Sequence, residues 1–354
     1  MEKINSLKNF LKSSDEAILI TSSENRRYFT AFPSSDGYLI VTKTDAVFFT
    51  DSRYIEAAQK KCVCKVKLLT RLSNEVKEFL TDNNVKKVYT ETERLSVSLL
   101  SQLRKILSPI KVTPSQKLEN LINNLRSVKD TDEIENIKKA QAIAEEAFNH
   151  ILTFIKPGVT EKQIALELDF YMLSHGAEAL SFETIAVTGA KTSMPHGVPD
   201  DTVVKNGDFI TMDFGAVYSG YHSDMTRTVA VGFVSDEQRK IYDLVLKAQE
   251  TALCVLEKGV SCAEADKAAR RIIEDAGYGE YFGHGTGHGV GIEIHESPNL
   301  SPRSTQKLKR GNVVTVEPGI YLPGKFGVRI EDMALITEKG YENLTSSPKE
   351  LIIL

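Results

Sequence analysis

Five side chains that commonly ligate metals lie within one stretch of the 354-residue chain, between positions 213 and 331. Four are carboxylates and one is an imidazole, and they fall on three separated segments: Asp213, Asp224, His288, Glu317 and Glu331. Such a set suits a pair of hard or borderline divalent cations. Each acid has apolar neighbours, as in ITMDF, VTVEP and VRIED. Because an unpaired buried carboxylate is costly, bound metal explains this pattern better than the alternative, solvated strand residues.

The first two acids are predicted to face each other across a hairpin. ITMDFGAVY reads as one strand and YHSDMTRTVAV as its return, joined across Tyr218-Ser219-Gly220. A turn centred between Tyr218 and Ser219 places Asp213 directly opposite Asp224. Directly opposed Cβ atoms lie roughly 4.5–5.5 Å apart, which suits two metals about 3.5–4 Å apart. A register shift of one residue would turn one acid to the other face.

A second hairpin repeats this geometry. Val313 to Tyr321 reads as an apolar strand, and residues 327–337 read as its return after the turn Pro323-Gly324-Lys325. With the turn centred near Gly324, Glu317 lies opposite Glu331. Two hairpins, each with a carboxylate pair, could hold two metals from both sides.

Four of the seven histidines fall in segments punctuated by glycine or proline, where functional residues tend to lie: His196, His284, His288 and His295. The segment GHGTGHGVG lets the backbone approach a small group closely. It is not a dinucleotide loop, because no G-x-G-x-x-G in it begins a helix. Of the other three, His150 and His175 fall on predicted helices, where a structural role is preferred, and His222 lies in the first hairpin.

The elements that must position these residues repeat along the chain. Helices are predicted over 132–155 and from Thr160 to Gly176, and again over 235–259 and 261–277. Start signals of the S/T-x-x-E/Q type precede three of them: Thr160 with Gln163, Ser235 with Gln238, and Ser261 with Glu264. The segments PGVT and KGVS lie 101 positions apart. This pattern predicts an internal duplication, in an α+β domain with a curved, mainly antiparallel sheet.

The first third of the chain predicts a smaller α/β domain, residues 1–122, ahead of a catalytic domain at 123–354. Short β-rich runs (AILI, GYLIVT, AVFFTD) alternate there with helical segments such as SVSLLSQLRKIL. The segment CVCKVKLL reads as a strand in which Cys62 and Cys64 are packing residues.

Composition excludes several classes of protein. A hydrophobic content of 41% and a charged content of 26% are ordinary for a soluble globular protein. The net charge of −4 gives no support to nucleic-acid binding. No apolar run approaches the roughly 18 residues of a membrane span, and the first residues lack a signal-peptide core. The four cysteines have neither zinc-ligand nor redox spacing, so a cytoplasmic protein with free thiols is expected.

The D-x10-D pair, HGTGHGVG, VEPGIY and VRIED together resemble the dinuclear metallopeptidase family with the pita-bread (creatinase/aminopeptidase-like) fold. The resemblance covers residues 130–345 and extends to the first third, where SSENRRYFTAF and FFTDSRYIEAA are similar to the creatinase/prolidase N-terminal domain. It therefore points to the Xaa-Pro peptidase branch, aminopeptidase P and prolidase. Methionine aminopeptidases generally lack such a domain and are a poorer match.

The resemblance implies roles for particular residues. Asp213 would chelate one metal, Asp224 and Glu331 would bridge both metals, and His288 and Glu317 would complete the two ligand sets. The resemblance also implies substrate-binding histidines and an arginine that orients carboxylates: His196, His284 and His295, and Arg329. It further implies two divalent metal ions per chain, manganese ahead of cobalt or zinc, and a homodimer whose small domain overhangs the neighbouring site.

The expected activity is hydrolysis of the bond between an N-terminal residue and a following proline by a metal-bridging hydroxide. The nitrogen of that tertiary amide carries no hydrogen, so it must receive a proton to leave, and Glu317 is the candidate donor. Imidazole N–H groups of His196 or His295 would stabilise the developing oxyanion.

Three alternatives remain at the level of sequence. A prolidase would act on Xaa-Pro dipeptides alone and would need a cation for the free carboxylate, for which Arg303 is a candidate. A peptide-binding pseudoenzyme would keep the fold without turnover. A hydrolase or lyase acting on a non-peptide amide would differ in substrate alone.

Overall fold

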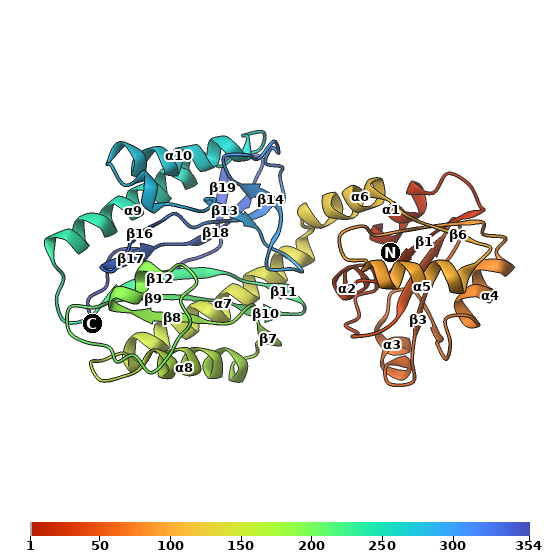
Figure 1. The fold of residues 1–354 in the computed structure, drawn as a ribbon, viewed down its shortest axis with the longest axis horizontal. Coiled ribbons are helices and arrows are strands. Elements are labelled where there is room, and N and C mark those ends of the chain that lie inside the picture. The colour runs from red at the N-terminus through yellow and green to blue at the C-terminus, as the bar shows by residue number, and fades with distance from the viewer. Residues whose placement is uncertain (1) are drawn as a thin grey trace. The chain divides into compact units, whose positions relative to one another are not determined.

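The computed structural model describes residues 2–354, which form two compact units, residues 2–126 and Ser127–Leu354. Both units are drawn in Figure 1. None of the helices within residues 2–354 combines the length and apolar character that a membrane crossing requires. The predicted boundary between residues 122 and 123 falls within a helix, Gln116–Ser127, and stays a prediction.

The first unit is a six-stranded sheet with helices packed against it (Figure 1). In spatial order its strands are β4 (Lys65–Leu68), β3 (Ala46–Thr50), β2 (Tyr38–Thr42), β1 (Glu16–Ile20), β5 (Lys87–Thr90) and β6 (Lys111–Pro114). The helices are α1 (Glu2–Phe10), α2 (Ser23–Thr30), α3 (Ile55–Lys61), α4 (Glu75–Asp82), α5 (Val97–Leu107) and α6 (Gln116–Ser127). The mixture of parallel and antiparallel pairs confirms the predicted α/β class.

One prediction in this unit is wrong in detail. Cys62 and Cys64 do not alternate within a strand, because Cys62 caps the end of α3 and β4 begins only at Lys65. Both are free cysteines, and burial raises the pKa of the Cys62 thiol to about 12 and that of Cys64 to about 11. Unreactive, partly buried thiols are consistent with the packing role that was predicted.

Four helices cover the strands of the second unit: α7 (Thr131–Phe154), α8 (Glu161–Ser174), α9 (Asp236–Cys254) and α10 (Cys262–Asp275). Capping boxes at Thr160 and Ser235 are confirmed, and Ser261 accepts from the N–H of Glu264 at the start of α10. The predicted continuation of α9 to Gly259 is wrong. The helix ends at Cys254 because Leu256 turns into the core and the N–H of Gly259 donates to Leu308 O.

The strands of this unit form a three-stranded sheet in the first half, a five-stranded sheet in the second half, and smaller sheets. The first half contributes β8 (Ile185–Thr188), β9 (Phe209–Phe214) and β12 (Met225–Ala230), with β7 (Ala179–Leu180), β10 (Ala216–Tyr218) and β11 (Tyr221–His222) alongside. The second half contributes β13 (Gly287–Gly289), β14 (Glu296–Leu300), β15 (Val313–Val316), β18 (Asp332–Ile336) and β19 (Tyr341–Asn343), with the pair β16 (Gly319–Leu322) and β17 (Phe326–Arg329). Short 3-10 turns lie at η1 (Gly189–Ser193) and η2 (Gly279–Tyr281).

In Figure 1, α7 and α8 run along the first-half strands, and α9 and α10 run along the second-half strands. Each layer has its own apolar core, represented by Phe148 and Met212 in the first half and by Tyr242 and Val314 in the second. The strand pairs of this unit are antiparallel. This confirms the α+β class with a mainly antiparallel sheet.

Equivalent backbone hydrogen bonds show the internal duplication. In the first half Gly158 N donates to Val204 O (3.0 Å), and in the second half Gly259 N donates to Leu308 O (2.8 Å). The reverse bonds, from Val204 N to Val159 O and from Leu308 N to Val260 O, are both 2.9 Å long. Val204 and Leu308 are 104 positions apart, as are Asp213 and Glu317. These two acids therefore occupy equivalent places in the two hairpins.

The register of the first hairpin differs from the prediction by two residues. Asp213 pairs with Thr226 rather than with Asp224, and the turn residues are Ser219 and Gly220. Both have positive φ, 49° and 84°, which is the backbone that a tight two-residue hairpin turn prefers. The centre of the turn is therefore one residue later than predicted. Because the shift is even, Asp213 and Asp224 still belong to the same face.

The register of the second hairpin is confirmed. Val316 on β15 pairs with Asp332 on β18, and Gly319 on β16 pairs with Arg329 on β17. Both strand pairs follow the same register, and that register places Glu317 opposite Glu331. Each of these acids lies in a short gap, between β15 and β16 or between β17 and β18. The hairpin is thus interrupted at the two glutamates, and their backbone N–H groups donate outside the hairpin, to Thr286 O and Thr226 O.

Candidate metal centre

A cavity of about 760 Å³ in the second unit is lined by residues from both halves. This size is typical of small-molecule and peptide sites. The lining includes all five predicted ligands, the three predicted substrate histidines and the predicted orienting arginine: Asp213, Asp224, His288, Glu317, Glu331, His196, His284, His295 and Arg329. Arg303 is not among the lining residues and is exposed on the turn after β14.

Three predicted ligands already converge on one point. Asp224, His288 and Glu331 each offer a ligand atom, and these atoms lie within 4.8 Å of one another. The Nε2 atom of His288 is 3.5 Å from Asp224 Oδ2 and 3.6 Å from Glu317 Oε1. Glu331 Oε2 also accepts a hydrogen bond from Thr226 Oγ1 at 2.7 Å. Four of the five groups therefore form one cluster around His288.

Arg329 holds the fifth group, Asp213, beside this cluster. Its Nη2 donates to Asp213 Oδ2 at 2.6 Å, its Nη1 donates to the hydroxyl of Tyr321 at 3.0 Å, and its Nε donates to Thr226 Oγ1 at 3.0 Å. The other oxygen of Asp213, Oδ1, is buried and has no hydrogen-bond partner among the described residues. A buried carboxylate oxygen normally has a partner, and a bound metal cation would provide one for Asp213 Oδ1.

The carboxylates strongly disfavour one another's ionisation. Burial, reinforced by Asp213 and Glu317, raises the pKa of Asp224 well above its ordinary value. Burial and Asp224 do the same to the pKa of Glu331. Burial raises the pKa of Glu317 to about 8, although Arg329 acts in the opposite direction. Divalent cations would relieve this repulsion, so the donor set fits bound divalent metal.

His288 is suited to the same purpose. Burial lowers the pKa of its imidazole to about 4, so the ring is neutral near pH 7. A neutral imidazole is the form that ligates metals. Its Nδ1 lies 3.1 Å from Gly289 O, which leaves Nε2 directed at Asp224 and Glu317.

These pKa shifts predict that chelator-treated protein loses stability between pH 7 and pH 8.5. Glu317 titrates at its ordinary value of 4.5 when unfolded but near 8 when folded, so the folded state holds a proton that the unfolded state lacks. Its stabilising contribution is complete below pH 4.5 and is lost as the pH rises through 8. The free energy of unfolding should fall by about 1 kcal/mol over this range from Glu317 alone. Urea unfolding at pH 7 and at pH 8.5 measures this difference in the free energy of unfolding.

Adding Mn²⁺ should flatten this pH dependence, because a ligand that binds the folded state alone stabilises it and keeps the carboxylates ionised. Chelator-treated protein whose stability is constant or rises from pH 7 to pH 8.5 would contradict the described electrostatics.

The glycine-rich histidine segment is fixed by α10. Asp266 accepts hydrogen bonds from the N–H (3.0 Å) and the hydroxyl (2.9 Å) of Thr286, while Arg270 pairs with Asp266 and donates to His284 O. A Cβ at Gly287 would lie 2.0 Å from Thr315 O, so glycine is required for β13 to approach β15. The segment contains the short strand β13 and is otherwise irregular, so it is not a helix, as the sequence indicated.

The three predicted substrate histidines surround the cluster. His284 Nε2 lies 2.9 Å from the hydroxyl of Tyr321, and burial lowers the pKa of His284 to about 4. The ring of His295 packs edge-on against that of His288, with centroids 4.3 Å apart, and burial lowers its pKa too. His196 is exposed at the cavity wall. His196 and His295 can present N–H groups to a bound substrate, whereas both ring nitrogens of His284 already lie within hydrogen-bond distance of Gly285 O and the Tyr321 hydroxyl.

Sequence reasoning missed two polar residues of the site. Tyr321 links His284 to Arg329, and burial raises the pKa of its phenol to about 12, so it stays a hydrogen-bond donor. Thr226 bonds both Glu331 and Arg329. The only sequence signal for Tyr321 and Thr226 is strand alternation, which places each of them on the same face as the predicted ligands of its strand.

Comparison with known proteins agrees with this geometry. Residues 135–338 match metallopeptidase family M24, and residues 4–128 match the creatinase/prolidase N-terminal domain. The chain is 37% identical to an Xaa-Pro dipeptidase of Pyrococcus furiosus, and the match covers 99% of each sequence.

Two solved structures are similar over nearly their whole length. An Xaa-Pro dipeptidase from Bacillus anthracis superimposes with a TM-score of 0.95 at 43% identity, covering 100% of this chain and 99% of that one. An X-Pro aminopeptidase from Thermotoga maritima gives a TM-score of 0.92 at 37% identity, covering 98% and 99%. With its creatinase/prolidase N-terminal domain and its pita-bread catalytic fold, the chain belongs to metallopeptidase family M24.

Proposed function

We propose that this metallopeptidase removes an N-terminal residue that precedes proline, using two divalent metal ions. The observation that carries the proposal is the convergence of four acids and His288 in one cavity, with Asp213 Oδ1 lacking a partner. The similar proteins named as an Xaa-Pro dipeptidase and an X-Pro aminopeptidase support the choice of proline as the second residue.

The metal ligands would be Asp213, Asp224, His288, Glu317 and Glu331. Two bound divalent ions supply a water molecule of lowered pKa and an electrophile for the scissile carbonyl. Manganese is the proposed metal, and cobalt and zinc are alternatives, because all of them accept carboxylate and imidazole ligands.

The chain's own residues would complete the reaction. Glu317 would carry a proton to the proline nitrogen, which as part of a tertiary amide has no hydrogen of its own. The N–H groups of His196 or His295 would donate to the oxyanion that develops on the carbonyl. Arg329 would hold Asp213 in place through their 2.6 Å contact, and His284 would line the substrate path.

Three further parts of the proposal concern location, assembly and domain limits. The four free cysteines support a cytoplasmic location. Resemblance to the Xaa-Pro peptidase branch supports a homodimer. The domain limits 1–122 and 123–354 are kept, with the second domain carrying the chemistry.

We propose aminopeptidase activity ahead of strict dipeptidase activity, because the cavity, as lined by residues 2–354, offers no evident cation for the carboxylate of a dipeptide. Among the described residues that line it, Arg329 is the one with a guanidinium and none is a lysine. Arg329 is already bonded to Asp213 and Tyr321, so it is not free to bind the carboxylate of a dipeptide. Arg303 remains a candidate clamp for the alternative, an Xaa-Pro dipeptidase, although it lies outside the cavity lining.

A peptide panel tests this proposal. The protein is stripped with chelator, resupplied with Mn²⁺, Co²⁺ or Zn²⁺, and assayed on an Xaa-Pro dipeptide, an Xaa-Pro-Yaa tripeptide and a matched Xaa-Ala-Yaa tripeptide. We expect metal-restored release of Xaa from the two proline peptides and little from the alanine control.

Cleavage of the dipeptide alone would establish the dipeptidase alternative and would direct attention to Arg303. Equal cleavage of the alanine control would contradict proline specificity. No cleavage of any peptide, with two metal equivalents bound, would contradict peptidase activity on Xaa-Pro bonds.

A further inference from the structure

A buried ion pair joins the two duplicated halves directly behind the metal cluster. Arg227 on β12 and Asp332 on β18 contact each other at 2.8 Å, and their side chains are 1% and 0% exposed. They are 105 positions apart, as are Val231 and Ile336, whose N–H groups make matching bonds in the two halves. Arg227 and Asp332 are therefore equivalent residues of the duplication that meet where the halves join.

One member of the pair is the chain neighbour of a cluster residue, and the other is the chain neighbour of a residue that hydrogen-bonds to the cluster. Arg227 follows Thr226, and Asp332 follows Glu331. The N–H of Glu331 donates to Thr226 O at 3.1 Å, its carbonyl accepts from Arg227 Nη1 at 2.5 Å, and its carboxylate accepts from Thr226 Oγ1 at 2.7 Å. Because Glu331 lies in the gap between β17 and β18, these bonds to the other half fix its position.

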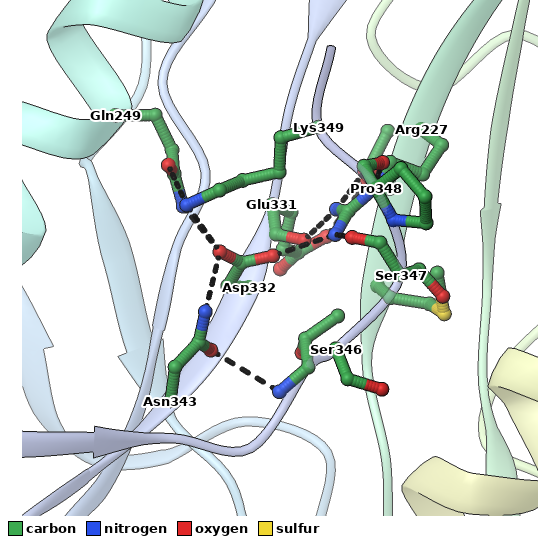
Figure 2. Close-up of polar contacts among 12 residues, drawn as sticks. Arg227, Gln249, Glu331, Asp332, Asn343, Ser346, Ser347, Pro348 and Lys349 are labelled. Atoms are coloured by element: carbon green, nitrogen blue, oxygen red, sulfur yellow. Dashed lines mark hydrogen bonds and ion pairs between the residues drawn. The ribbon is translucent and has the colours of Figure 1, made fainter. Parts of the chain in front are cut away.

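The pair is itself held by the segment that follows β19. Arg227 Nη2 donates to Ser347 O at 2.7 Å, and Arg227 Nε donates to Pro348 O at 2.9 Å. Lys349 Nζ lies 3.0 Å from Asp332 Oδ2. Figure 2 shows Asp332 at the centre of these contacts, with Arg227, Lys349, Gln249 and Asn343 around it. The Asp332 carboxylate contacts four side chains through hydrogen bonds or ion pairs, and these contacts fix its orientation.

We propose that Arg227 and Asp332, braced by Lys349, are positioning residues that hold Glu331 in place to bind metal. The inference rests on the proposed metal site. A buried ion pair contributes little more to folding than apolar residues of similar size would, so its expected effect is on the geometry of the site. Partners behind a metal ligand typically change metal affinity about 10- to 100-fold when they are replaced.

The variant Asp332→Asn tests the proposal in the full chain. Co²⁺ binding is measured by calorimetry, and the visible absorption spectrum of bound Co²⁺ reports the ligand geometry without any need for turnover. We expect Asp332→Asn to weaken Co²⁺ binding about 10- to 100-fold and to alter the spectrum.

Tyr242→Phe is the matched control, because it removes a hydrogen bond to the same segment, from the Tyr242 hydroxyl to Lys349 O at 2.7 Å, without touching Asp332 or Glu331. Its Co²⁺ affinity and spectrum should equal those of the parent, even if its melting temperature falls. A folded Asp332→Asn protein with the parent's affinity and spectrum would overturn the inference.

If Asp332→Asn does not fold, Lys349→Met decides, because it keeps the ion pair between Asp332 and Arg227 and removes the contacts of Lys349 with Asp332 and Gln249. A several-fold loss of Co²⁺ affinity supports the positioning role, and an unchanged affinity overturns it. Failure of the parent protein itself to bind Co²⁺ would contradict the proposed function instead, so the two failures are distinguishable.

Discussion

Glu317→Gln is expected to lower kcat by a factor of about 10²–10⁴ on an Xaa-Pro tripeptide, the usual contribution of a positioned proton carrier. The amide has nearly the shape of the carboxyl group, but it can neither take up nor release the proton that the proline nitrogen requires. Glu317 is part of the cluster, 3.6 Å from His288 Nε2, so some loss of metal affinity is expected as well. Steady-state kinetics at saturating Mn²⁺ separates the two effects.

Glu237→Gln is the matched control, since that glutamate is exposed in an ion pair with Lys325 on the surface. Its kcat and its metal content should equal those of the parent. A Glu317→Gln protein with full metal content and an unchanged kcat would show that Glu317 does not carry the proton.

Asp224→Asn is expected to reduce bound metal from two equivalents per chain to one or fewer and to abolish measurable turnover. Asp224 is buried between His288, Glu331 and Glu317, and the proposed role for it is to bridge both ions. An asparagine offers a single neutral oxygen, so it can neither bridge two cations nor offset their charge. Metal analysis of the purified variant, dialysed against excess Mn²⁺, measures the loss.

Asp243→Asn, an exposed position on α9, serves as the control and should retain both metals. Two full equivalents on Asp224→Asn would exclude Asp224 as a bridging ligand. Loss of turnover with two metals retained would restrict its role to the chemical step.

The two hairpins show where sequence reasoning about register succeeds and where it fails. Pro323-Gly324-Lys325 marks the centre of the second turn clearly, and the opposition of Glu317 and Glu331 follows from it. The first turn, around Ser219, contains residues that fit either of two centres. Local turn preference does not decide between them, so the sequence predicts the correct face for Asp213 but the wrong opposing residue.

Contacts between the halves could not be predicted from local patterns. Thr226 and Arg227 are strand residues whose roles depend on how the first-half sheet meets the second-half hairpin. Periodicity assigns a residue to a face of its own strand, but it does not show which strand of the other half that face will contact. The ligand types, in contrast, were identifiable because acids among apolar neighbours require a partner.

The assignment of Arg303 illustrates the same limit. The resemblance to prolidases makes Arg303 a candidate for binding a substrate carboxylate, but the turn after β14 leaves it exposed, while Asn299 and Ser301 line the cavity. Distance along a loop does not determine which of its side chains face the cavity. The role of Arg303 therefore stays a prediction for the dipeptide assay.

The central claim is that two divalent metal ions in this cavity are required for hydrolysis of Xaa-Pro bonds. The most direct test is a titration of chelator-stripped protein with Mn²⁺, in which release of Xaa from an Xaa-Pro tripeptide is followed against metal equivalents per chain. The account predicts no activity without metal and a rise that saturates at two equivalents. Full activity in the presence of chelator, or no activity at any metal content, would contradict it.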